Sequence, residues 1–147
     1  MAAASLSPKA FVEKWSQVRV NEIAAAQSHF NDVCALVGHD APLQADPRGA
    51  FFRFEQPTQK SGGNQGRADV FYRHKFIWEY KGAHANLDKA YQQLLLYRES
   101  LGNPPLLITC DLQRIVIHTN FTDTARQSHE VDFDRLLNGD GLNLLQR

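Results

Sequence analysis

Residues 69–81 read Asp69-Val70-Phe71-Tyr72-Arg73-His74-Lys75-Phe76-Ile77-Trp78-Glu79-Tyr80-Lys81. Two apolar runs flank a polar centre, a pattern that is typical of a β-hairpin. If the turn is centred on His74, residues whose numbers sum to 148 face each other, which places Asp69 opposite Glu79. Because side chains alternate along a strand, Lys81 lies on the same face as both acids. The other face is suited to a core and carries Val70, Tyr72, Phe76, Trp78 and Tyr80.

The two opposed acids imply a cation. Directly opposed Cβ atoms in a sheet lie about 4.5–5.5 Å apart, and like charges at that spacing are destabilising. A divalent metal would remove the repulsion, and carboxylate oxygens are the hard donors that Mg²⁺ prefers. The hairpin therefore predicts a divalent-metal site formed by Asp69 and Glu79, with Lys81 beside it.

The spacing Asp69-x9-Glu79-x-Lys81 resembles the PD-(D/E)xK nuclease core. The next expected helix carries Gln93 and Tyr97, which match the Q-x3-Y signature of the RecB-like branch of these nucleases. The D…ExK pattern alone is weak because it arises by chance, and its combination with Q-x3-Y makes the resemblance specific.

Over roughly residues 10–135 the chain is similar to the N-terminal nuclease region of MmeI-type (type IIL) restriction–methylation enzymes. These fuse an endonuclease, an adenine-N6 DNA methyltransferase and a target-recognition domain in one polypeptide. The segments that carry the similarity are Gly66-Arg67-Ala68-Asp69, 78–82, 87–91 and 110–114. Ala68 departs from the nuclease pattern, in which proline often precedes the aspartate. The resemblance implies that residues 1–147 are a single nuclease domain, the N-terminal fragment of a longer chain with methyltransferase and target-recognition domains downstream.

The resemblance also implies a reaction, the Mg²⁺-dependent hydrolysis of phosphodiester bonds in double-stranded DNA, with Mn²⁺ as a substitute metal. Asp69 and Glu79 would bind the metal, and the Tyr80 backbone carbonyl would be a third ligand. Lys81 would orient the attacking water, help to deprotonate it and offset charge in the transition state.

Three further residues receive roles from the same resemblance. Gln93 would hold Lys81 or a water molecule at the metal, and Tyr97 would buttress the site or touch phosphate. RecB-like nucleases often add an acid from the first helix, and Glu22 is the candidate here. The alternative for Glu22 is ordinary stabilisation of the helix dipole from the first turn.

The net charge of the chain is zero, but its basic residues are unevenly spread. Between residues 60 and 81, five basic side chains stand against two acidic ones. This balance predicts contacts with DNA phosphates, although ordinary solvated surface charge is the alternative. The candidates are Lys60, Arg67, Arg73 and Lys75. Lys60 lies in the polar segment 56–66, which is expected to be either a flexible hairpin connection or a mobile flap over the substrate.

Bulk properties suit one soluble domain: 147 residues, of which 43% are hydrophobic. No apolar run approaches the roughly 18–20 residues of a membrane span, and the first residues lack the pattern of a signal peptide. Cys34 and Cys110 fall in apolar contexts, so they are expected to be buried thiols rather than a disulfide. These features predict a cytoplasmic protein with no membrane partner.

The expected elements define the fold class. Helices are expected from Ser7-Pro8 to Val18, from Asn21 to Val37 and from Leu87 to Leu101, with a short last one near Asp132. Strands are expected at 51–55, 106–110 and 114–119, in addition to the hairpin. This order predicts an α/β fold with a central mixed β-sheet flanked by helices, like that of PD-(D/E)xK restriction endonucleases.

Two alternatives to a restriction nuclease remain open. One is a catalytically silent DNA-binding or scaffolding domain that kept the nuclease fold. The other is a standalone DNA-repair nuclease of the same fold. Methyltransferase motifs downstream in the parent gene would favour the restriction fusion, whereas loss of the aspartate, glutamate or lysine would have favoured the silent domain.

Overall fold

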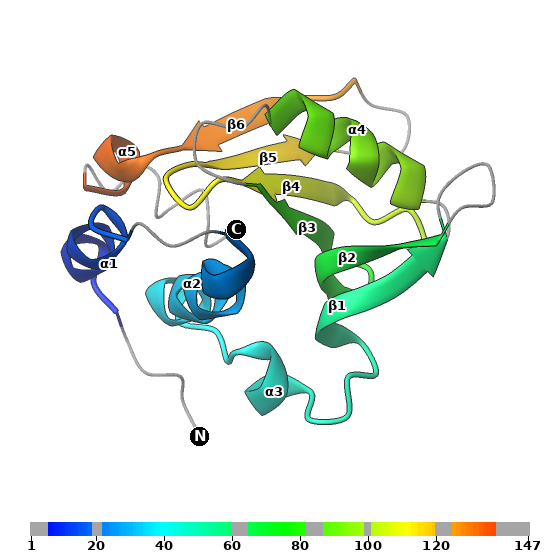
Figure 1. The fold of residues 1–147 in the computed structure, drawn as a ribbon, viewed down its shortest axis with the longest axis horizontal. Coiled ribbons are helices and arrows are strands. Elements are labelled where there is room, and N and C mark those ends of the chain that lie inside the picture. Colours follow the sequence, from blue (N-terminus) through cyan, green and yellow to red (C-terminus); the bar gives the residue numbers. More distant parts are fainter. Residues whose placement is uncertain are drawn as a thin grey trace.

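The computed structural model describes residues 6–18, 22–59, 65–81, 87–98, 101–119 and 125–137. The strands are β1 (Phe52–Gln59), β2 (Gln65–Tyr72), β3 (Phe76–Tyr80), β4 (Leu106–Cys110), β5 (Ile115–Thr119) and β6 (Ser128–Val131). They form one six-stranded sheet in sequence order, in which only the β3–β4 pair is parallel. Figure 1 shows the sheet fanned from β6 to β1.

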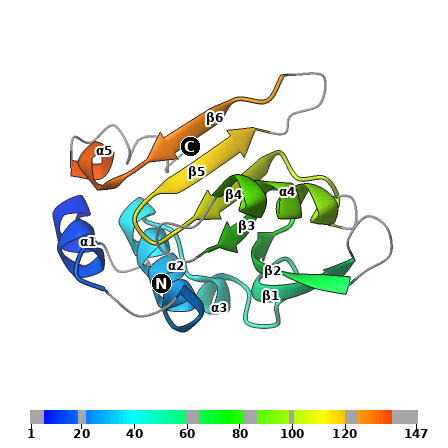
Figure 2. The same ribbon diagram turned by 45° about the horizontal axis from the view of Figure 1, so that its top comes forward.

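The helices are α1 (Pro8–Trp15), α2 (Glu22–Val37), α3 (Pro42–Ala45), α4 (Leu87–Tyr97) and α5 (Phe133–Leu137). The helices α1, α2 and α5 pack against one face of the sheet, and α4 packs against the other (Figures 1 and 2). Since two parallel strands need a crossover connection, α4 supplies the link between β3 and β4. The predicted α/β class, a mixed sheet flanked by helices, is confirmed.

The β2–β3 hairpin has the predicted register. Phe71 pairs with Ile77 and Val70 pairs with Trp78, so residue numbers sum to 148 as expected. Trp78 is buried on the α2 face, where its ring lies 5.0 Å from that of Phe30 in an edge-to-face contact. A slip of one residue would turn the acids into this aromatic core and the aromatic rings out to the other face, so burial fixes the register.

A second apolar cluster joins α4 to the opposite face. Leu94 and Tyr97, which are three residues apart on one side of α4, pack against Phe71, Ile77 and Leu107. All of these side chains are buried. The packing fixes the rotation of α4, and therefore the direction in which its polar residues point.

Two expectations about strands were wrong. The first strand is not confined to 51–55 but runs to Gln59, and residues 65 and 66, expected in the connection, belong to β2. Pro57 and Gly66 made this segment resemble a loop. Proline is tolerated there because β1 is an edge strand, where a missing N–H need not break a ladder. The edge strand β6 was not predicted at all, because three of its four residues are polar.

Helix boundaries also differ from the expectations. The helix expected to reach Leu101 ends at Tyr97, the helix expected to reach Val18 ends at Trp15, and the four-residue α3 was not predicted. The last short helix was expected near Asp132 and begins at Phe133, which confirms it.

The prediction that both cysteines are buried thiols is confirmed. Cys34 and Cys110 are buried free thiols, and burial raises the pKa of Cys34 to about 12. Within the described residues, no helix has the length and apolar character needed to cross a membrane.

Candidate functional site

Asp69 and Glu79 occupy neighbouring positions on β2 and β3. The Val70–Trp78 pair continues by one residue in the same register, which places the two acids opposite each other. Asp69 Oδ2 accepts a hydrogen bond of 2.7 Å from the Tyr80 backbone N–H, so the next residue of β3 orients this carboxylate. Glu79 is only 4% exposed. A buried carboxylate beside a second one is costly unless positive charge is supplied nearby.

Both acids line one cavity of about 300 Å³. Its walls come from α2 and the first three strands: Ala26, Gln27, Phe54, Glu55, Asp69, Val70, Glu79, Tyr80 and Lys81. The cavity therefore brings together the aspartate, glutamate and lysine that the sequence singled out. Within the described residues, no three His, Cys, Asp or Glu side chains are arranged to hold a metal ion. A metal here would depend on the two carboxylates together with backbone oxygen or water.

Lys81 is connected to α4 through a chain of polar side chains. Its Nζ donates a hydrogen bond of 3.2 Å to Gln93 Oε1, and Gln93 Nε2 donates in turn to the Tyr97 hydroxyl. The backbone N–H of Lys81 donates to the Cys110 carbonyl of β4 over 2.8 Å. The structure thus brings Gln93 and Tyr97 to the lysine, as the Q-x3-Y spacing predicts.

The Tyr80 side chain is anchored on the face opposite the acids. Its hydroxyl forms a hydrogen bond of 2.8 Å with Nδ1 of His29 in α2. His29 also lies edge-on to the rings of Phe11 and Trp15. Burial lowers the pKa of His29 to about 3 and raises the pKa of Tyr80 well above its usual value, so both groups are neutral near pH 7. This contact fixes the residue whose backbone N–H orients Asp69.

Sequence reasoning missed Glu55 on β1. The pairs Phe54–Val70 and Gln56–Ala68 flank it, and their numbers sum to 124, so Glu55 stands opposite Asp69. Its side chain is exposed and borders the cavity. Its φ of 54° is unusual for a non-glycine residue within a strand. Nothing in the local sequence marks this residue, because the signal is the β1–β2 register, which was not predicted.

The other predicted residues are placed only in part. Glu22 is the first residue of α2, and its side chain lies outside the described residues; Ala26, one turn further along, borders the cavity. Lys60 and the side chain of Arg67 also lie outside the described residues. These three assignments stay predictions.

Arg73 and Lys75 are exposed in the turn between β2 and β3. Arg73 is four residues along the chain from Asp69, which corresponds to about 13 Å of strand. Its guanidinium donates a hydrogen bond of 2.7 Å to the Ala50 carbonyl, so part of its role is to tie the turn to the segment before β1. The distance means that a phosphate contact by either residue would lie well away from the acids.

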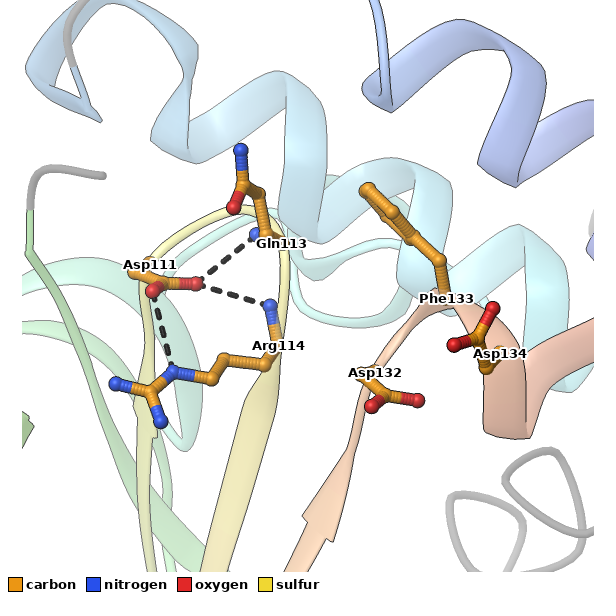
Figure 3. Close-up of a pocket in the computed structure, with 6 residues that line it drawn as sticks. All are labelled: Asp111, Gln113, Arg114, Asp132, Phe133 and Asp134. Carbon is orange, nitrogen blue, oxygen red and sulfur yellow. Dashed lines mark hydrogen bonds and ion pairs between the residues drawn. The ribbon is translucent and has the colours of Figure 1, made fainter. Parts of the chain in front are cut away.

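A second cavity, of about 350 Å³, is lined by acids but differs in chemistry (Figure 3). Asp111 accepts hydrogen bonds from the backbone N–H groups of Gln113 and Arg114 at 3.0 and 2.9 Å, and its other oxygen contacts Arg114 Nε at 3.3 Å (Figure 3). These bonds stabilise the tight turn between β4 and β5, in which Leu112 has a φ of 75°. The carboxylate is therefore occupied within its own turn, and we assign it a structural role.

Comparison with known proteins identifies a family and a similar fold. The sequence matches the family described as "MmeI, N-terminal domain" over residues 2–146. No curated protein shows significant similarity to the chain. Among solved structures, a chain of the "cryoEM structure DrdV-DNA complex" is similar with a TM-score of 0.56 and 19% sequence identity. The similarity covers 94% of the present chain and 13% of that chain, and at this identity it establishes the fold alone. The chain belongs to the family of MmeI N-terminal domains.

Proposed function

We propose that this domain is the Mg²⁺-dependent endonuclease of a type II restriction–modification enzyme and hydrolyses phosphodiester bonds in double-stranded DNA. Membership in the MmeI N-terminal family supports a relation of the domain to restriction enzymes. The observation that carries the proposal is the convergence of Asp69, Glu79 and Lys81 on one cavity, with Gln93 bonded to the lysine.

The residues present fit a hard divalent cation. Asp69 and Glu79 offer carboxylate oxygens at one cavity, and Mg²⁺ needs only one or two protein carboxylates because it keeps several waters. When bound, Mg²⁺ would offset the charge of the two acids and the charge that develops on the phosphate. The Tyr80 carbonyl is the proposed third ligand, and Mn²⁺ is the proposed substitute metal.

Lys81 has the remaining role in the proposed reaction. Its ammonium group would orient the attacking water, favour loss of the water proton by stabilising the hydroxide that forms, and stabilise negative charge in the transition state. Gln93 accepts a hydrogen bond from Nζ and so limits the positions open to the amine. The hydroxyl of the buried Tyr97 accepts a hydrogen bond from the Gln93 amide and so orients the Gln93 side chain. The chain Tyr97–Gln93–Lys81 would therefore position the amine before substrate arrives.

The parent protein is also part of the proposal. The present chain spans only about an eighth of the length of the similar solved chain, so further domains are expected in the protein that contains it. We propose a methyltransferase and a target-recognition domain downstream, and the cytoplasm as the location. Sequence choice would then come from the downstream domains, and this domain would contact mainly the DNA backbone.

A metal-dependent plasmid-cleavage assay tests the proposal. The wild-type chain should nick supercoiled DNA with Mg²⁺ or Mn²⁺ and not with EDTA, and Asp69→Ala should abolish nicking. The matched control is Asp134→Ala, which removes an exposed aspartate from α5, away from the acid pair. Cleavage that survives Asp69→Ala, or that needs no metal, contradicts the proposal. If the wild-type chain binds DNA and metal but does not cleave DNA, either alone or within its parent enzyme, the catalytically silent scaffolding domain is favoured.

A further inference from the structure

Thr109 lies in the middle of β4 and is completely buried. Its hydroxyl oxygen has no hydrogen-bond partner among the described residues. A hydroxyl buried without a partner costs free energy that a valine of nearly the same shape would avoid. A buried polar atom of this kind therefore calls for a physical reason.

The neighbours of Thr109 on the sheet suggest that reason. Thr109 pairs with Glu79 of β3 on one side and with Val116 of β5 on the other. Adjacent strands lie about 4.7–4.9 Å apart, and paired residues point to the same face, so the threonine stands directly beside the carboxyl-bearing side chain. Since Val116 is apolar, Glu79 is the cross-strand neighbour that can accept a hydrogen bond.

A hydrogen bond from Thr109 would act on a carboxylate that has more freedom of rotation than that of Asp69. The Tyr80 backbone N–H already orients Asp69 from within the hairpin. Glu79 has a flexible side chain with one more rotatable bond, and it is almost fully buried at the cavity wall. A hydroxyl beside it can hold one carboxylate oxygen and so limit the directions in which the other can point. Rotation about the Cα–Cβ bond of Thr109 is enough to turn the hydroxyl, without movement of the backbone.

We propose that Thr109 is a positioning residue whose hydroxyl donates a hydrogen bond to the Glu79 carboxylate and holds it in the orientation that binds a divalent cation. The inference rests on the proposed function, because it assumes that Glu79 is a metal ligand. Thr109 itself touches neither the metal nor the DNA.

The test is calorimetric titration of Mn²⁺ into the 147-residue chain, together with thermal melting without metal. Thr109→Val keeps the branched shape and removes the hydroxyl, whereas Thr109→Ser keeps the hydroxyl and removes a methyl group. Leu107→Val is the packing control, because Leu107 is buried two residues away on the same face of β4. Glu79→Gln reports on the metal site itself, and circular dichroism confirms that each variant is folded.

We expect Thr109→Val to weaken Mn²⁺ binding about tenfold, the usual range for one hydrogen bond to a charged group. Its melting temperature without metal should equal or exceed that of the wild type. Thr109→Ser should bind Mn²⁺ with wild-type affinity but have a lower melting temperature. Leu107→Val should also keep wild-type Mn²⁺ affinity and have a lower melting temperature. A merely structural threonine would give the opposite pattern, with lower stability in the valine variant and unchanged metal affinity.

Each other outcome is decisive. If Thr109→Val binds Mn²⁺ like the wild type while Glu79→Gln does not, the positioning role is wrong and the metal site stands. If serine and valine weaken binding equally, the shape of the side chain is responsible and the hydrogen bond is excluded. If Glu79→Gln also binds like the wild type, the proposed metal site fails, and the role of Thr109 fails with it.

Discussion

The β2–β3 hairpin and the turn between β4 and β5 each contain an acid that is almost completely buried, but the surroundings of the two carboxylates differ. Asp111 receives its partners from the next three residues, two backbone N–H groups and the guanidinium of Arg114. Glu79 and Asp69 come from two strands and meet at a cavity, and the nearby Lys81 is directed to Gln93 on a helix. An acid with local partners stabilises a turn, whereas acids brought together by the fold leave room for a ligand.

The largest effect should separate binding from chemistry at the hairpin. Lys81→Ala should reduce DNA cleavage by at least about a hundredfold, because it removes the cation that would stabilise the transition state. Mn²⁺ affinity should be unchanged or higher, since a positive charge near the acids is lost. Glu79→Gln should lose both cleavage and Mn²⁺ binding, because an amide oxygen is a poor ligand for a hard cation. Wild-type cleavage by Lys81→Ala would show that the lysine assignment is wrong.

The next effect contrasts the two acids by stability. Asp111→Ala should lower the free energy of unfolding by about 1 kcal/mol, because it leaves two partly buried backbone N–H groups without their acceptor. Asp69→Asn should leave stability without metal nearly unchanged or raised, since repulsion with Glu79 is relieved, and should reduce the rise in melting temperature caused by Mg²⁺. Melting curves with and without Mg²⁺ give both quantities. An equal metal-induced shift in wild type and Asp69→Asn would remove this carboxylate from the ligand set.

An effect of similar size concerns pH and the support beneath the hairpin. The folded-state pKa of His29 is about 3 against an ordinary 6.5, so between these values the unfolded state binds the proton and the folded state does not. Stability should therefore fall as the pH drops below 6.5, and this one group should contribute a loss of about 2 kcal/mol between pH 7 and pH 5. His29→Gln should lack this contribution, even if it is less stable at pH 7. Parallel pH profiles in both proteins would contradict the assignment.

The smallest effect concerns DNA affinity. The isolated domain should bind DNA without sequence preference, with an affinity that falls as salt rises. Lys75→Ala should lower the slope of log affinity against log salt by about 0.9 and weaken binding a few-fold, if Lys75 contacts one phosphate. Lys9→Ala, which removes an exposed lysine from α1, is the control. An unchanged slope in Lys75→Ala would mean that Lys75 is ordinary surface charge.

Local patterns were sufficient for the centre of the fold. The alternation in residues 69–81 predicted the hairpin and its register, because period-two burial tolerates only one pairing. The Q-x3-Y spacing predicted that Gln93 and Tyr97 share one side of α4, because residues four apart on a helix are neighbours. Strands with a weak or polar pattern were not predicted. The edge strand β6 has little apolar character, and Pro57 made the second half of β1 resemble a loop.

The sequence by itself determined that two acids and a lysine share one face of a hairpin, because side-chain direction in a strand depends only on residue number. Tertiary structure alone decided what surrounds them. The β1–β2 register brings Glu55 beside Asp69, the parallel β3–β4 pair places Thr109 beside Glu79, and α2 brings His29 beneath Tyr80. These contacts join residues 14 to 51 positions apart. No local periodicity records them, because they follow from how strands and helices pack after each has formed.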